Sequence, residues 1–175
     1  MNIVERTQII GGFVPLDLQV ARSAQYVELP DRYHATIILF KGLGTDGDDP
    51  IITLQQASTI TGTGVKALNF SRIWRKQATD VLTVPVFTLT TQTPASTYTN
   101  TDGHQQAIWV LEVEAADLDK AGGFNFIRVI INDTGVNAQL GSVLYIIGPP
   151  DLDPPPTLRA LRHMMESLLS KYIPT

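Results

Sequence analysis

The sequence predicts an all-β protein, an antiparallel β-sandwich of about eight strands with a jelly-roll-like arrangement. Short segments rich in β-branched and aromatic residues recur along the chain, and Gly, Pro, Asn and Asp separate them. Several segments alternate apolar with polar side chains, which is typical of strands with one buried and one solvated face. The chain has 175 residues, of which 43% are hydrophobic, so it is long enough for one domain with its own core.

Residues 1–24 come before the first clear strand. Their apolar stretch at 9–16 is interrupted by two glycines and a proline. Two interpretations stay open for this segment: an arm that lies against another protein, or an edge segment of the sandwich. We expect Phe13, Val14 and Leu16 in this segment to contact a partner.

Residues 25–147 form the predicted sandwich domain. Pro85 has no N–H to donate, so the strand that contains it lies at an edge or begins after it. A slip in the alternation near Ser71 and Arg72 predicts a bulge. Residues 143–147 are all apolar, which predicts a strand in the middle of a sheet, covered on both faces. The expected strands cover 25–29, 34–41, 51–57, 66–77, 82–92, 107–114, 124–132 and 139–147.

Residues 148–156 include five prolines, and proline-rich segments favour a stiff polyproline-like conformation. This stretch predicts a spacer between the sandwich and a C-terminal amphipathic helix at 157–175, with Thr157 as its N-cap. A helix of this length is marginal alone in water, so its apolar stripe packs either on its own sandwich or on a neighbouring subunit. The stripe residues that we expect to contact a partner are Leu161, Met165, Leu168 and Tyr172.

Composition excludes several classes of function. The net charge of -4 argues against a general nucleic-acid binder, because such proteins present a basic face. The chain has no cysteine, which excludes disulfides, thiolate zinc sites and cysteine nucleophiles. No apolar run approaches the roughly 18 residues that a membrane helix needs, and the first residues lack the pattern of a secretory signal. We therefore expect neither nucleic acid nor a membrane as a partner.

Residues with catalytic or metal-binding potential form no recognisable motif. Asp46, Asp48 and Asp49 crowd one loop, and this pattern suits either a calcium site or a solvated turn. The three histidines are far apart in the sequence, and no Gly-x-Ser-x-Gly motif is present. We expect no enzyme, no cofactor and no metal site, with cation binding at the aspartate loop left open.

Seven phrases of the sequence resemble a family of small virion proteins of tailed bacteriophages. Members of this family are similar to head-associated structural proteins encoded near the major capsid protein, and their motifs are not catalytic. The phrases are ARSAQYV at 21–27, TIILFKG at 36–42, GDDP at 47–50, TLQQA at 53–57, KALNF at 66–70, TYTNT at 97–101 and NAQLG at 137–141.

The resemblance implies a non-enzymatic capsid decoration protein, or cement protein, that binds and stabilises the shell of the major capsid protein. It also implies a homo-oligomer on the capsid surface of the virion, made in the host cytoplasm. Two other classes stay open. One is a head–tail connector or tail structural protein, present in few copies per particle. The other is a carbohydrate-binding module, in which Trp74, Tyr98 and Trp109 would stack on sugar rings.

Overall fold

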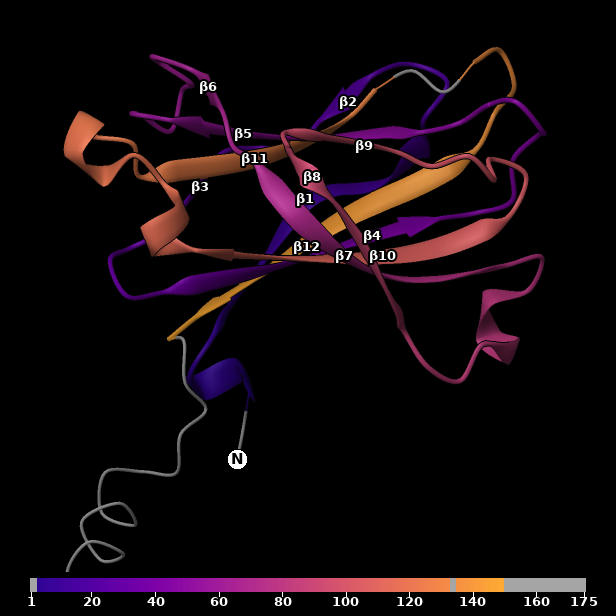
Figure 1. Ribbon diagram of the computed structural model, residues 1–175, viewed down its shortest axis with the longest axis horizontal. Helices are drawn as coiled ribbons and strands as arrows, with labels where there is room; N and C mark the ends of the chain where they lie inside the picture. The colour runs from indigo at the N-terminus through magenta and orange to yellow at the C-terminus, as the bar shows by residue number, and fades with distance from the viewer. Residues whose placement is uncertain (1–2, 133–134, 150–175) are drawn as a thin grey trace, which may run out of the picture.

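The computed structural model describes residues 3–132 and 135–149, and these residues form two antiparallel β-sheets packed face to face (Figure 1). This architecture confirms the predicted all-β sandwich. The described part of the chain contains short 3-10 turns but no α-helix, and no helix in it could span a membrane. Residues 150–175, which hold most of the expected spacer and the whole expected helix, lie outside the described residues.

The larger layer, sheet A, is built from the long strands of the chain. Each strand is antiparallel to its neighbours, and the expected strands at 34–41, 107–114 and 139–147 are found within a residue of their predicted bounds. In spatial order, sheet A contains β1 (Gln8–Asp17), β12 (Leu140–Gly148), β4 (His34–Lys41), β10 (Gln106–Glu114), β7 (Phe70–Ala78) and β8 (Thr88–Ala95).

Sheet B covers the inner face of sheet A and is assembled around two strands. Its order is β2 (Arg22–Ser23), β11 (Phe126–Ile131), β5 (Ile51–Ala57) and β6 (Lys66–Ala67). Two short strands complete it, β3 (Val27–Glu28) beside β11 and β9 (Thr97–Thr99) beside β5. The 3-10 turns are η1 (Ile3–Glu5), η2 (Val81–Thr83), η3 (Ala115–Asp117) and η4 (Lys120–Gly122).

The described chain has twelve strands, more than the eight expected. Strands β1, β2 and β9 lie outside the expected strands, and one expected strand is divided between the two sheets. The segment 66–77 divides into β6 in sheet B and β7 in sheet A, and buried Leu68 lies at the crossing. The expected bulge is present as a register shift between Phe70 and Arg72. The strand near Pro85 begins after it, at Thr88, and lies at the edge of sheet A.

The N-terminal segment is an edge strand of the sandwich, which was one of the two interpretations that the sequence left open. Strand β1 pairs with β12 along residues 8–17, with register shifts after Gly11 and after Phe13. Gly12 permits this close approach, because a Cβ there would come within 2.7 Å of Val143.

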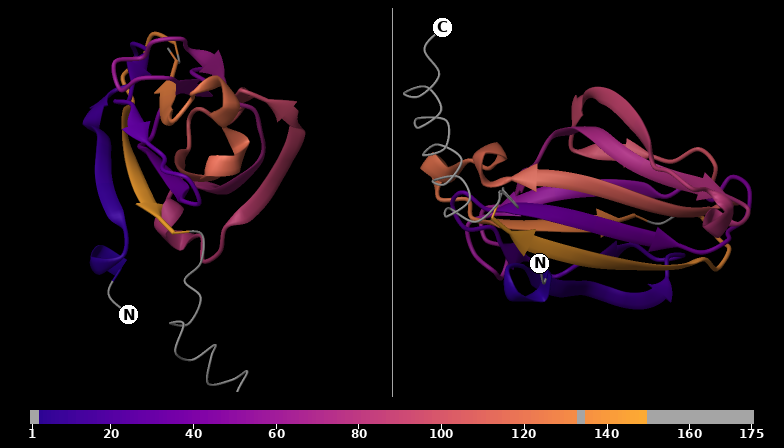
Figure 2. Two further views of the ribbon diagram at one scale, coloured as in Figure 1. Left: turned by 90° about the vertical axis from the view of Figure 1, so that its left-hand side faces the viewer. Right: turned by 90° about the horizontal axis from the view of Figure 1, so that it is seen from below.

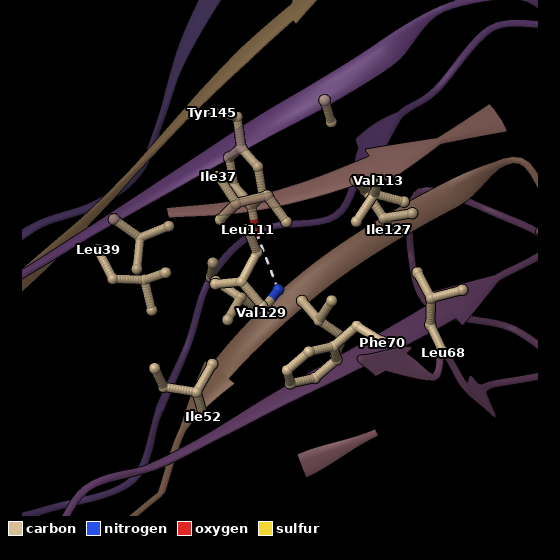
Figure 3. Packing of buried hydrophobic residues seen from close by; sticks show 14 of the residues in the cluster. Ile37, Leu39, Ile52, Leu68, Phe70, Leu111, Val113, Ile127, Val129 and Tyr145 are labelled. Carbon is tan, nitrogen blue, oxygen red and sulfur yellow. Dashed lines mark hydrogen bonds between the residues drawn. The ribbon is translucent and has the colours of Figure 1, made fainter. Parts of the chain in front are cut away.

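The core lies between the sheets, and one polar group inside it joins them. Trp109 and Tyr145 are the largest fully buried side chains. The backbone N–H of Val129 in β11 faces the gap between β2 and β3, where no strand supplies an acceptor. The hydroxyl oxygen of Tyr145, reaching across from β12, accepts this hydrogen bond at 3.0 Å (Figure 3). Tyr145 thus fills a vacant position in the ladder of the opposite sheet.

Candidate interaction surface

The predicted contact residues of the N-terminal segment differ in how accessible they are. Phe13 is half-buried and packs against the core, whereas Val14 is 70% exposed and Leu16 is 37% exposed. Pro15 and the two register shifts make β1 a poor template for another strand. The edge therefore offers side-chain contacts rather than strand addition.

The predicted contact residues of the C-terminal helix lie outside the described residues, so the structure places none of them. These residues are Leu161, Met165, Leu168 and Tyr172.

Sheet A carries an apolar row on its outer face, the face turned away from sheet B. Residues directly opposite each other in neighbouring antiparallel strands lie on the same face of a sheet. Register places Leu144 opposite Ile38, and Ile38 opposite Val110. It then places Val110 opposite Trp74, and Trp74 opposite Leu89. We call these five side chains, which cross five strands, the outer row.

Further apolar side chains border the outer row. Within the outer row, Trp74 is 37% exposed and the other four side chains are half-buried. Phe40, which borders the row, is 42% exposed. The outer face of an antiparallel sandwich is normally polar, because it meets water. Seen from below in Figure 2, sheet A is not covered by any other described element. The residues that border the row on this face are Ile9, Phe40, Ile108 and Ile146.

One end of this face is polar and hollowed. The hollow measures about 380 Å³ and lies beside the exposed ring of Trp74. Glu112 is held there by neighbours on β4: its Oε2 lies 3.1 Å from Nε2 of His34 and accepts a hydrogen bond of 3.0 Å from the hydroxyl of Thr36. The hollow is lined by Arg72, Trp74, Glu112, Glu114 and Asp117.

The aspartate loop is organised around a buried lysine. Lys41 is 4% exposed, and its ammonium group donates hydrogen bonds to the carbonyl oxygens of Gly42, Gly103 and Gln105. Burial lowers the pKa of Lys41 to about 8, and the carboxylates of Asp49 and Asp48 partly oppose this shift.

Each of these two carboxylates accepts a backbone hydrogen bond. Asp49 accepts one from the N–H of Gly103 at 3.0 Å, and Asp48 accepts one from the N–H of Asn137 at 3.2 Å. The carbonyl oxygens around Lys41 and the carboxylates of Asp48 and Asp49 are thus bound by donors of the chain itself.

The remaining metal-binding side chains do not converge. Among the described residues, no three His, Cys, Asp or Glu side chains lie close enough together to hold a metal ion. His104 pairs with exposed Asp46 at 3.4 Å, and His34 lies on the outer face of sheet A. His163 lies outside the described residues.

The aromatic residues proposed for sugar stacking are separated by the fold. Trp109 is fully buried in the core, and Tyr98 packs against the core from a half-buried position. Of the three, only Trp74 faces outward over a hollow.

The outer row was not among the predicted contact residues, although the sequence contains a signal for it. Three strands contain runs of consecutive apolar residues, at 37–40, 108–111 and 143–147. A strand with one solvated face should alternate, so such runs indicate that both faces are apolar. The prediction of a strand that is apolar on both faces covers only the third run, whereas the structure places all three strands side by side.

No protein-family model matches this chain, and a search of curated proteins finds no match.

Proposed function

We propose that this chain is a non-enzymatic structural protein of a tailed-phage virion, a capsid decoration protein that binds the major capsid protein and stabilises its shell. Its location would be the capsid surface, and its body a jelly-roll-like sandwich extended by the C-terminal helix. The observation that carries the proposal is the apolar outer face of sheet A, which no described element covers and which a neighbouring chain of an assembly would cover. The resemblance of seven sequence phrases to head-associated virion proteins supplies the biological setting.

An uncovered apolar sheet face favours an assembly role over a soluble monomeric role. Large contiguous apolar patches on soluble proteins mark surfaces that other chains cover. Stable interfaces bury about 1,200–2,000 Å² in total, which is an area on the scale of a sheet face. A protein that reinforces a shell against internal pressure needs contacts of this kind and needs no reactive groups.

The exposed side chains of β1 supply the contact with the capsid. Val14 and Leu16 lie on the sheet edge, and Ile9 on the same strand borders the outer row. We assign capsid contact to Val14 and Leu16. Phe13 packs partly on the core, and its exposed part stays in the proposed contact.

Co-sedimentation of the purified protein with heads of the encoding phage tests this proposal. We expect the protein to pellet with heads in a copy number comparable to that of the capsid subunits. Val14→Asp should weaken pelleting, because it places a charge in the contact. The matched control is Val20→Asp, at an exposed valine just outside β1. Failure of the unmodified protein to bind heads, or equal losses in both variants, would contradict capsid binding at this edge.

Copy number separates the decoration role from the second structural class. A head–tail connector or tail component is present in few copies per particle, whereas a decoration protein follows the repeating shell. Quantitative electrophoresis of purified virions measures this ratio directly.

A carbohydrate-binding role retains one supporting observation, the hollow beside Trp74. An indole ring flanked by carboxylates and a guanidinium can stack on a sugar and bind its hydroxyl groups. If this role were correct, a glycan array would give binding that Trp74→Ala abolishes. An array without binding removes this alternative.

A further inference from the structure

The apolar outer face of sheet A needs an occupant, and the chain itself contains a suitable one. We propose that the outer row of one molecule is covered by the C-terminal segment 158–173 of a second copy. This segment carries Leu158, Leu161, Met165, Leu168, Leu169 and Tyr172 at helical three- and four-residue spacing.

The two apolar surfaces match in length. The outer row crosses five strands, so its ends are separated by four interstrand spacings, about 19 Å. From Leu158 to Tyr172 a helix rises about 21 Å. One helix can therefore cover the whole row, and docking would bury the apolar surface of both the row and the helix.

The two surfaces also complement each other in charge. The hollow that flanks the outer row beside Trp74 is lined by three carboxylates and one guanidinium group. Segment 158–173 contains three basic residues, Arg159, Arg162 and Lys171, and one acidic residue, Glu166. Docking places basic side chains near Glu112 and Glu114, where opposite charges fix the orientation.

The point at which the chain leaves the sheet favours a second copy over the molecule's own row. Strand β12 ends at Gly148, and Leu144 lies four residues upstream, about 13 Å inside the sheet. Prolines restrict most of the linking residues 149–156, and an extended linker of eight residues spans about 25 Å. If the stiff linker continues in the direction of β12, a helix of 16 residues, about 24 Å long, that turned back from its end would reach only the end of its own sheet.

Chemical crosslinking tests the proposal without background, because the chain has no cysteine. Val110→Cys places a thiol at the centre of the outer row, and Met165→Cys places one at the centre of the segment. When the two singly substituted proteins are mixed and treated with a short bis-maleimide, we expect a product of two chains that neither protein forms alone. The control pair replaces Val110→Cys with Val20→Cys, which lies away from the row and should give no product.

Light scattering on the purified full-length protein supplies the second measurement. We expect a mass of at least two chains, which falls to one chain in the double variant Leu161→Asp with Met165→Asp. Neither change falls in a described strand, so the far-ultraviolet circular dichroism of the strands should persist.

Two results would overturn the proposal. An internal crosslink in a monomeric chain carrying both cysteines would show that a molecule covers its own row. A monomer without any crosslink would show that the segment leaves the row open. Both measurements use the protein without capsids, so their outcome is independent of the co-sedimentation test.

Discussion

The hydroxyl group of Tyr145 provides a quantitative test of how the two sheets are joined. Tyr145→Phe removes only the oxygen that accepts the hydrogen bond from the N–H of Val129. The ring still fills its buried site, so no cavity forms. The lost acceptor leaves a buried N–H without a partner, which costs about 1–3 kcal/mol. For a chain of this size, each kcal/mol lowers Tm by roughly 2–4 °C.

Urea unfolding, followed by tryptophan fluorescence and circular dichroism, measures this loss at pH 7. We expect a lower midpoint with an unchanged m-value, because the surface exposed on unfolding is the same. Tyr33→Phe, at an exposed tyrosine, is the matched control and should change stability by less than about 0.5 kcal/mol. Equal effects of the two substitutions would show that the hydroxyl of Tyr145 does not hold the sheets together.

The stability difference between the wild type and Tyr145→Phe should depend on pH. Burial raises the pKa of Tyr145 above its ordinary value of 10.0. The folded protein therefore keeps this proton at a pH where the unfolded chain releases it. The resulting stabilisation is complete below pH 10 and is lost as the pH rises further. The stability difference between the wild type and Tyr145→Phe should accordingly narrow above pH 10, and a constant difference would contradict the raised pKa.

Three further predictions concern the end of the sandwich around Lys41. Burial lowers the pKa of Lys41 to about 8, so the unfolded chain binds this proton more tightly than the folded protein does. In urea unfolding, the stability of the wild type relative to Lys41→Met should therefore rise between pH 8 and about 10. A stability difference that falls over this range would show that the pKa of Lys41 is raised. Gly103→Ala should lower Tm in calorimetry, because a Cβ there would collide with the backbone of Asp48. Gly47→Ala should lower Tm less, because a Cβ there has open space and only the positive φ is unfavourable. Millimolar calcium should leave Tm unchanged, because backbone N–H groups already bind the carboxylates of Asp48 and Asp49 and the nearby Lys41 ammonium offsets part of their charge. A rise in Tm with calcium would establish a cation site.

The positions of most strands could be predicted because alternation is a local property. His34–Lys41 and Ile51–Ala57 form strands over the same residues that their patterns indicated. The paired position of β1 could not be predicted, because two glycines and a proline interrupt its pattern and only contact with β12 compensates for them.

The candidate surface shows the same division. The exposed apolar side chains of β1 were identified from sequence, but the inward packing of Phe13 was not, because it depends on the register with β12. Lys41 ends an ordinary strand pattern, yet the carbonyl oxygens that bind its ammonium belong to Gly103 and Gln105, more than sixty residues later.

The sequence by itself determined the secondary-structure class, the absence of thiol chemistry and the apolar stripes at both ends of the chain. Only the tertiary structure decided that the runs at 37–40, 108–111 and 143–147 lie side by side and form one outward apolar face. The physical reason is that side-chain periodicity defines which residues share a face of a strand. What covers that face depends on contacts between segments that are distant in the sequence.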